Sequence, residues 1–274
     1  YSYEKNYLSG IETVKKLVGE FDKLSSQICT VGLGIPGFSS KESGLVTNAN
    51  SMWLNDKPFK KDLEIALNRK VKLMNDANCF TLSEAVDGSG KDYQSIFGII
   101  VGTGFGGALS YKKEIIEGAN QIAGDWGHQP LPYPTKEEIE TKINCPSMNC
   151  GRLLCAEQFM SGIGFKDVFN QKHKTNFTSE EIAKLDLDGD SRANSELSLY
   201  EDRMARLLAV MIGIFDPDAI ILGGGMSNID RFYINIPTLI PKYTFSNKVK
   251  TKLLKNFHGD SSGVRGAAWL WNNV

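Results

Sequence analysis

The aspartate at position 76 stands where an expected strand ends and an expected helix begins. It belongs to the run Asn75-Asp76-Ala77-Asn78, which follows apolar residues 71–74 and precedes a helical pattern over residues 77–86. Aspartate at such a position is commonly a helix N-cap, and propensity alone favours that role. The alternative is a general base for a bound hydroxyl, because α/β folds place ligands at the carboxyl ends of strands.

Two glycine-rich runs also follow expected strands. Residues 102–107 read Gly-Thr-Gly-Phe-Gly-Gly, but residues 108–111 indicate a strand, whereas a dinucleotide-binding fingerprint opens a helix. The run is either a hairpin whose backbone N–H groups approach phosphate oxygens or a tight hairpin without a ligand. Residues 223–225, three glycines after the expected strand 219–222, are either a shelf for a flat base or a turn that needs positive φ.

A histidine and three cysteines form a candidate metal site. His128 follows Asp125-Trp126-Gly127, and Cys145, Cys150 and Cys155 recur every five residues. Cysteine and histidine are the preferred ligands of zinc. The C-x4-C-x4-C spacing is looser than the usual C-x2-C, and a lone histidine beside a tryptophan is usually structural. The pattern therefore indicates zinc without excluding a structural histidine.

The composition restricts the class of protein. Hydrophobic residues make up 41% and charged residues 23% of the 274 residues, which is typical of a soluble globular chain. The net charge of −1 offers no overall attraction for nucleic acid or an acidic membrane. No apolar run approaches the roughly 20 residues that span a bilayer. Five cysteines without a secretory signal indicate reduced thiols or a metal site, so we expect a cytoplasmic protein.

Strand and helix patterns alternate along the chain. Alternation of this kind predicts an α/β fold, and Thr178-x-x-Glu181 is a capping box that marks a helix start. We find no long linker, so a division into domains has to run through the glycine turns. The expected helices are 7–21, 58–68, 77–86, 194–215 and 262–271, and the expected strands are 28–34, 71–74, 95–101, 108–111 and 219–222.

Taken together and in order, these motifs resemble the ROK family, whose name joins repressors, unassigned reading frames and kinases. The resemblance covers essentially the whole chain. Its markers are residues 34–37 (Gly-Ile-Pro-Gly), 75–78, 102–107, 127–128 (Gly-His), Cys150-Gly151 through Cys155-x-Glu157, 222–225 (Leu-Gly-Gly-Gly) and the closing segment 258–268. Residues 48–55 (Asn-Ala-Asn-Ser-Met-Trp-Leu-Asn) resemble the bacterial fructokinase/mannokinase branch in particular.

The resemblance implies a two-lobed, actin-like α/β fold with ligands in the interdomain cleft. The first lobe would comprise residues 1–101 and 262–274, and the second residues 102–261. The implied activity is ATP-dependent phosphorylation of a hexose, D-fructose foremost and also mannose, with Mg²⁺. The alternatives are a kinase for glucose or N-acetylglucosamine, and a sugar-sensing transcriptional regulator, for which this sequence shows no helix-turn-helix. The resemblance also implies a homodimer. The net charge of −1 leaves neither nucleic acid nor a membrane as an expected partner.

The resemblance assigns roles residue by residue. Asp76 would be the catalytic base, beside Asn75 as a hydrogen-bonding partner of the sugar. Asp125, His128 and Glu157 would bind sugar hydroxyls, with Asp125 in the place of a family glutamate. The zinc ligands would be His128, Cys145, Cys150 and Cys155. The residues expected to contact ATP phosphates are Gly102, Thr103, Gly104, Gly106 and Gly107, and those expected beside the adenosine are Gly223, Gly224 and Gly225.

Three departures from the family pattern qualify these roles. Asp125 is one methylene shorter than glutamate. The family's zinc stretch reads C-x-C-G-x-x-G-C-x-E, and Met148 and Leu154 stand at its first Cys and second Gly, so Cys145 would substitute as a ligand. The family's N-terminal D-x-G-G-T-K phosphate loop has no counterpart here. We therefore expect an incomplete first lobe and slow phosphoryl transfer by these 274 residues, because positioning of metal and phosphate dominates that chemistry.

Overall fold

The computed structural model describes residues 6–141, 143–146, 150–246 and 248–271. Their largest sheet has five strands in the order β7-β6-β5-β8-β9. Strands β5 and β6 form an antiparallel hairpin, whereas β8 runs parallel to both β5 and β9. The strands are β5 (Ser95–Val101), β6 (Phe105–Tyr111), β7 (Glu114–Ile116), β8 (Ala219–Gly223) and β9 (Lys252–Lys255).

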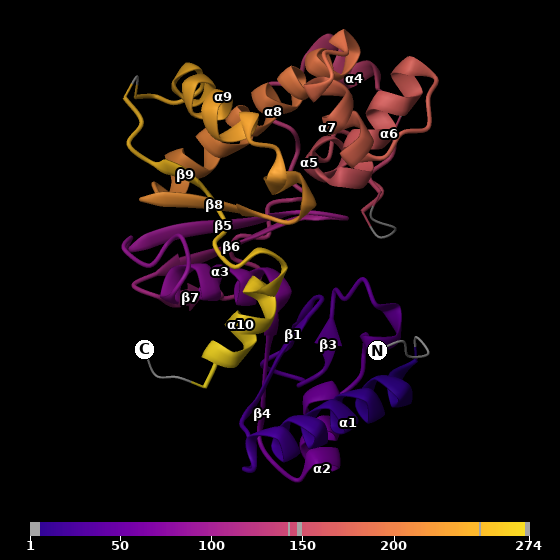
Figure 1. The fold of residues 1–274 in the computed structure, drawn as a ribbon, viewed down its shortest axis with the longest axis vertical. Helices are drawn as coiled ribbons and strands as arrows, with labels where there is room; N and C mark the ends of the chain where they lie inside the picture. The colour runs from indigo at the N-terminus through magenta and orange to yellow at the C-terminus, as the bar shows by residue number, and fades with distance from the viewer. Residues whose placement is uncertain (1–5, 142, 147–149, 247, 272–274) are drawn as a thin grey trace.

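Helices cover both faces of this sheet (Figure 1). Phe97 and Ile99 of β5 enter a core formed with the helices on one face, and Ile96 packs with Phe80 of α3 on the other. This alternation follows from the two-residue period of a strand. The first face carries α4 (Lys136–Glu140), α5 (Ala156–Met160), α6 (Gly162–His173), α7 (Ser179–Leu187), α8 (Ser191–Phe215) and α9 (Arg231–Leu239). The second carries α3 (Asp76–Val86), and α10 (Ser262–Trp269) packs on the far side of α3.

A smaller body lies beyond α3 and α10 (Figure 1). Its parallel strands β1 (Val31–Ile35) and β4 (Val71–Asn75) pack against α1 (Tyr7–Ser25) and α2 (Phe59–Leu67) around a separate core that includes Leu63. A short hairpin, β2 (Phe38–Ser39) and β3 (Val46–Thr47), extends from it. Four 3₁₀ turns complete the described elements: η1 (Met52–Leu54), η2 (Gly225–Asn228), η3 (Ile240–Lys242) and η4 (Gly259–Ser261).

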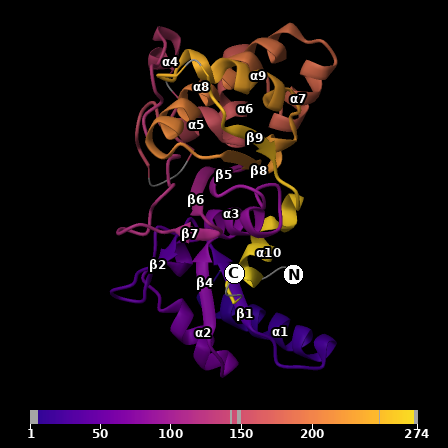
Figure 2. The same cartoon turned by 90° about the vertical axis from the view of Figure 1, so that its left-hand side faces the viewer.

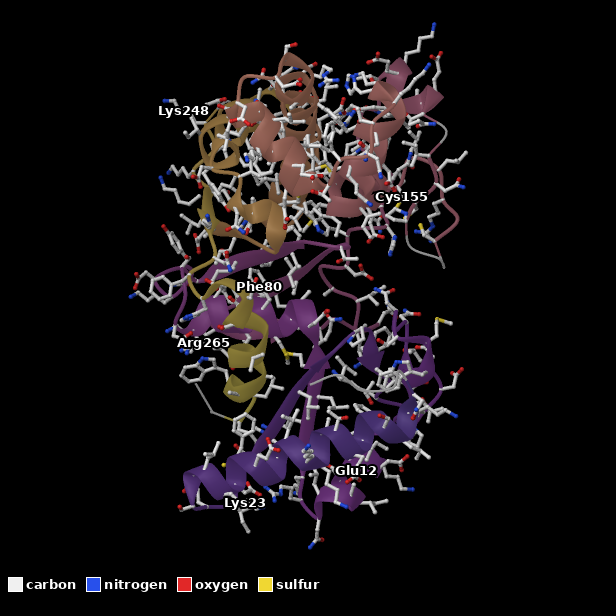
Figure 3. All side chains as sticks on the ribbon, turned by 45° about the vertical axis from the view of Figure 1, so that its right-hand side comes forward. Glu12, Lys23, Phe80, Cys155, Lys248 and Arg265 are labelled. Atoms are coloured by element: carbon white, nitrogen blue, oxygen red, sulfur yellow. The ribbon has the colours of Figure 1, made fainter. Side chains whose placement is uncertain are left out.

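Helix α3 is held by close backbone approaches at glycines. A Cβ at Gly98 would lie 2.1 Å from Thr81 Oγ1, and one at Gly223 would lie 2.3 Å from the Phe80 ring. Figure 3 shows Phe80 between α3 and the sheet. A Cβ at Gly266 of α10 would lie 1.7 Å from the Cys79 carbonyl oxygen. Glycine therefore allows α3 to contact the sheet on one side and α10 on the other.

The expected α/β alternation is confirmed, and each expected helix and strand is present within a few residues. The predicted lobe boundary after Val101 requires correction, because it divides the β5–β6 hairpin of one sheet. Strand β5 belongs with the strands that follow it, since its main-chain hydrogen bonds go to β6 and β8. Among the described residues, no helix combines the length and apolarity needed to span a membrane.

Candidate active site

A cavity of about 400 Å³ brings the predicted sugar-site residues together. Asn75 and Asp76 reach it from the β4–α3 junction, and the glycine turn 102–107 forms another wall. Asp125, His128 and Glu157 line it as well. Side chains separated by up to 82 positions in the sequence thus surround one volume.

Asp76 begins α3 but is not its cap. The N-cap is Asn75, whose Oδ1 accepts a hydrogen bond from the Ala77 N–H at 2.9 Å. Asp76 is open to the cavity, and its Oδ1 accepts from the same Ala77 N–H at 2.8 Å. Desolvation by the surrounding protein raises the pKa of Asp76, and the backbone hydrogen bond from Ala77 opposes that rise only in part. The carboxylate therefore faces the cavity as a stronger base than an ordinary aspartate.

Asn75 connects this junction to the smaller body. Its Nδ2 donates to the Gly37 carbonyl oxygen at 3.0 Å while its Oδ1 caps α3. Gly37 has φ of 72°, and a Cβ there would lie 2.2 Å from the Thr47 carbonyl oxygen. Because the amide has one further N–H, Asn75 can still donate to a ligand in the cavity.

At two positions of the 102–107 turn, neither the backbone conformation nor the packing requires glycine. Neither Gly102 nor Gly106 has a positive φ. Around a Cβ built at Gly106 the described part of the chain places nothing within 4 Å, and around one at Gly102 only Ile100 Cγ2 at 4.0 Å. At Gly107, by contrast, a Cβ would lie 2.7 Å from the Phe97 ring. Gly102 and Gly106 thus leave room for a ligand, whereas Gly107 serves packing.

A second pocket of about 700 Å³ lies on the other side of the same turn. Gly102 and Thr103 line both volumes, and residues of α6 and α7 and Gly225 line the second. Gly102 is fixed by the Gly162 N–H at the start of α6, which donates to its carbonyl oxygen at 2.7 Å. The glycine turn is therefore the partition between the two pockets.

The three glycines after β8 differ in their roles. Gly223 packs under Phe80, and Gly224 has φ of 83° with its Cβ position 2.5 Å from the Val101 carbonyl oxygen. Gly225 is exposed, lines the second pocket and has neither a positive φ nor a close neighbour among the described residues. The structure thus brings Gly225, but not Gly223 or Gly224, to the pocket.

Glu157 and Gly127 are fitted to the beginning of β6. Glu157 is buried, and its Oε2 accepts from the Phe105 N–H at 3.2 Å. A Cβ at Gly127 would lie 1.8 Å from the Phe105 carbonyl oxygen, so only glycine allows this approach. His128 and Glu157 are thereby placed beside the glycine turn.

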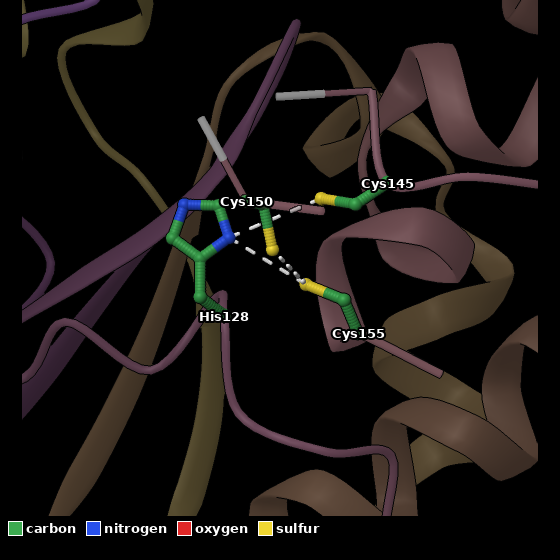
Figure 4. Close-up of side chains that lie close together, drawn as sticks. All are labelled: His128, Cys145, Cys150 and Cys155. Carbon is green, nitrogen blue, oxygen red and sulfur yellow. Dashed lines mark hydrogen bonds between the residues drawn. The ribbon is translucent and has the colours of Figure 1, made fainter. Parts of the chain in front are cut away.

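His128, Cys145, Cys150 and Cys155 converge in one cluster (Figure 4). Their ligand atoms all lie within 4.8 Å of one another. His128 Nδ1 is 3.9 Å from Cys145 Sγ and 3.5 Å from Cys155 Sγ, and Cys150 Sγ is 3.6 Å from Cys155 Sγ. A tetrahedral zinc with ordinary bond lengths would separate two sulfurs by ~3.8 Å and sulfur from nitrogen by ~3.6 Å. The residues present fit such an ion.

The chain departs from the family's zinc pattern at Met148 and Leu154. Met148 lies outside the described residues. Leu154, at the position of a family glycine, has φ of 55°, which is uncommon for a residue with a side chain. Cys145 takes part in the cluster, as expected for a substitute ligand. Leu154 therefore has a backbone conformation that glycine adopts without strain.

Comparison with known proteins decides the family. The ROK family matches residues 3–274. This chain belongs to the ROK family. The N-acetyl-D-glucosamine kinase of Vibrio cholerae is 37% identical over 265 residues, which are 97% of this chain and 88% of that protein. The enzyme of the same name from Haemophilus influenzae is 35% identical over 268 residues, with the same coverage.

Solved structures of ROK proteins share the fold. A ROK glucokinase from Streptomyces griseus, in complex with glucose and AMPPNP, superposes with a TM-score of 0.80 at 21% identity, covering 98% of this chain and 89% of that one. A ROK transcriptional regulator reaches 0.79 at 18% identity, covering 96% and 68%. The predicted two-lobed, actin-like fold is confirmed, and kinases and regulators of the family have it in common.

Cavity residues that the motifs did not identify come from the β2–β3 region and from the segment after β7. Asn48 and Asn50 line the cavity on either side of Ala49. Asn55 holds that turn, accepting from the Ala49 N–H at 2.9 Å and donating to its carbonyl oxygen at 3.0 Å. Gln121 lines the cavity from the segment after β7. The asparagines within residues 48–55 could have identified this part of the cavity from the sequence. Asn48 and Asn50 line the cavity beside the turn that Asn55 holds.

Proposed function

We propose that this protein is an ATP-dependent sugar kinase whose sugar is N-acetyl-D-glucosamine. The observation that carries the proposal is the partition of two pockets by the turn 102–107. Asp76 lines the first pocket, and Gly225 lines the second. A sugar in the first and a nucleotide in the second would meet at a glycine backbone, where N–H groups can approach phosphate oxygens.

The choice of sugar rests on the relatives rather than on the cavity. The Vibrio and Haemophilus proteins reported above are named N-acetyl-D-glucosamine kinases, a substrate that was an alternative on the resemblance. The expected preference for D-fructose finds no support among them. Fructose and mannose therefore become the competing substrates in the test below.

The proposed reaction follows from the position of Asp76. Its carboxylate would accept the proton of a sugar hydroxyl while that oxygen attacks the γ-phosphoryl group of ATP and ADP leaves. Asp125, Glu157 and the His128 nitrogen that faces away from the thiols would bind other hydroxyls. Mg²⁺ bound with ATP would neutralise charge on the phosphates, which together with positioning supplies most catalysis of this kind.

We further propose that the cluster of His128 and the three cysteines holds zinc. The ion would fix the orientation of the His128 ring through Nδ1 and so the direction of its other nitrogen. It would also join residues 128, 145, 150 and 155, which lie in irregular chain around the cavity. Its proposed role is structural.

A hexose panel tests the proposal. We expect the highest kcat/KM with N-acetyl-D-glucosamine among that sugar, D-glucose, D-fructose and D-mannose in an assay coupled to ADP formation. Sugar binding by calorimetry accompanies the kinetics. A preference for fructose would overturn the substrate, and absence of phosphorylation of every sugar would overturn the kinase.

A sugar-sensing regulator is the second candidate, favoured by the equally good superposition on a ROK regulator. It predicts sugar binding without ADP formation, and the same two measurements separate it from the kinase. The homodimer also stays a proposal, for which light scattering after gel filtration is the direct test.

A further inference from the structure

Two segments from different lobes meet beside the sugar cavity. One is the β2–β3 hairpin, residues 38–47, whose Val46 is buried in the core of the smaller body. The other, residues 117–123, follows β7 of the five-stranded sheet. Phe38 of the hairpin and Gln121, Ile122 and Ala123 line the cavity. This wall of the cavity is therefore shared by both lobes. Figure 2 shows β2 and β7, from which the two segments extend, on the same side of the molecule.

The side chain of Gln121 joins the two segments. Its Oε1 accepts a hydrogen bond from the Lys41 backbone N–H at 3.0 Å, and its Nε2 donates to the Ser39 carbonyl oxygen at 3.1 Å. The side-chain amide thus pairs with the backbone of the hairpin as a peptide group of a neighbouring strand would. Lys41 Nζ also forms an ion pair with the Glu117 carboxylate.

The backbone of residues 117–123 is folded to present this amide. Gln121 has φ of 57° and Gly118 has φ of 74°, while the Ala123 N–H donates to the Glu117 carbonyl oxygen at 3.2 Å. A left-handed conformation is uncommon for glutamine. Conformations of this kind persist where the surroundings over-determine them, and they cluster at ligand clamps and switch regions.

We propose that Gln121 is a positioning residue whose amide latches residues 117–123 onto the β2–β3 hairpin and closes the sugar cavity between the lobes. The inference rests on the proposed function. Neutral hydrogen bonds and partly exposed ion pairs each contribute modestly to stability, so the latch can open for sugar exchange. Closure fixes Ile122 and Ala123 in the wall and also Asp125, two residues further along the chain.

Gln121→Met is the decisive variant, because it keeps the length and bulk of the side chain but removes both hydrogen bonds. We expect the KM for the sugar to rise about tenfold, as the loss of two net hydrogen bonds predicts. The KM for ATP and kcat at saturating sugar should change less than about threefold, since Asp76 and the glycine turn are untouched. Gln171→Met, the same substitution at an exposed position of α6, is the matched control.

Hydrogen exchange reports the latch without any activity. The Lys41 amide donates to Gln121, whereas the Gly44 amide of the same hairpin donates to the Ser40 carbonyl oxygen at 2.8 Å. In Gln121→Met, exchange at Lys41 should accelerate about tenfold while exchange at Gly44 stays unchanged. Added sugar should slow exchange at Lys41 in the wild-type protein only.

The outcomes separate the latch from the function on which it rests. Unchanged exchange at Lys41 in Gln121→Met, or faster exchange with an unchanged sugar KM, overturns the latch. A decrease in kcat together with a decrease in Tm in Gln121→Met would show that the contact is merely structural. That result would overturn the latch as well. If the wild-type protein phosphorylates no hexose, the proposed function fails, and the exchange data together with sugar binding by calorimetry still decide the latch.

Discussion

Asp76 is available as a base because a neighbour takes the capping role. Asn75 satisfies the first N–H groups of α3, so the Asp76 carboxylate keeps an oxygen for a ligand. The walls of the cavity raise its pKa by desolvation without closing it to water. A base of this kind needs both properties, access to substrate and increased proton affinity.

Replacement of Asp76 by asparagine tests the proton transfer. We expect Asp76→Asn to lower kcat by about 10²–10⁴-fold, the usual loss for a positioned general base. Sugar binding measured by calorimetry should remain, because asparagine has nearly the same shape. Turnover close to that of the wild-type protein would remove Asp76 from the reaction.

The raised pKa of Asp76 makes a prediction for the pH profile. The base works only when deprotonated, so kcat/KM is lost as pH falls through its pKa. Because the pKa is raised, that loss should occur above the ordinary aspartate value of 3.8. Initial rates from neutral to acidic pH, with folding followed by circular dichroism, give the acid limb. A limb at or below 3.8 in folded protein contradicts the prediction.

Gly223 and Gly225 form a matched pair, because the first packs under Phe80 and the second lines the pocket proposed for the nucleotide. Gly225→Val should raise the KM for ATP about tenfold, equivalent to about 1.4 kcal/mol, at an unchanged Tm. Gly223→Ala should instead lower the Tm, since overpacking against Phe80 costs about 1–3 kcal/mol. Kinetics and thermal melts of both variants would contradict the assignment if the two effects were exchanged.

At the scale of elements, α3 is anchored at both ends. Asn75 ties its start to Gly37, and the buried carboxylate of Glu84 near its end accepts from the Phe257 N–H at 3.0 Å and from Ser262 Oγ at 2.8 Å. The same carboxylate accepts from the Ser89 N–H at 2.9 Å. The helix that begins with Asp76 is therefore attached to both lobes and to α10.

The cysteines lie in an irregular segment beside the site, and zinc would give that segment a fixed shape. Cys145→Ser should lower the zinc content of the purified protein, because serine is a poor ligand for this ion. It should also raise the sugar KM, since the orientation of His128 would be lost. Cys29→Ser, outside the cluster, is the control. Full zinc content in Cys145→Ser, or none in the wild-type protein purified without chelators, would contradict the proposal.

At the scale of the whole molecule, the lobe with the five-stranded sheet contains a buried network of charged side chains. The network joins α4 to α8. Glu138 Oε1 lies 2.8 Å from Arg203 Nε and 2.7 Å from an Arg206 guanidinium nitrogen. Arg206 also donates to the carbonyl oxygens of Pro132 and Tyr133, both at 2.8 Å. The network thus holds the chain between His128 and Cys145 against the large core.

The pKa of Glu138 predicts acid sensitivity. Burial opposes ionisation, but hydrogen bonds from Arg206, the Thr135 backbone and Arg203 outweigh it and lower the pKa from 4.5 to about 2. The stabilisation is therefore fully present above about pH 4.5 and is lost as pH falls towards 2. Glu138→Gln should be about 3–5 kcal/mol less stable at pH 7, the cost of breaking a buried pair, and should lose less further stability in acid.

Denaturant unfolding of the wild-type protein and Glu138→Gln between pH 7 and 3 measures both parts of that prediction. Glu140→Gln is the matched control, because Glu140 lies on the same helix but is exposed. Parallel pH profiles for the wild-type protein and Glu138→Gln would show that Glu138 is not the titrating group.

Local patterns predicted the elements because helix and strand periods are local properties. Helix α8, the capping box at Thr178 and strand β5 could all be read from spacing alone. The ordered motifs also predicted the family and the convergence of Asp76 with Glu157, since a family fold brings fixed positions together. Sugar preference could not be read in this way, and the fructokinase-like run 48–55 pointed to a sugar that the relatives do not support.

Tertiary structure decided which of several identical residues face a ligand. Gly223, Gly224 and Gly225 are alike in sequence, but a Phe80 ring, a positive φ and an open pocket distinguish them. The contact of Gln121 with Ser39 and the parallel pairing of β5 with β8 were likewise invisible in the sequence. These features depend on which distant segments come into contact, and neither periodicity nor spacing along the chain contains that information.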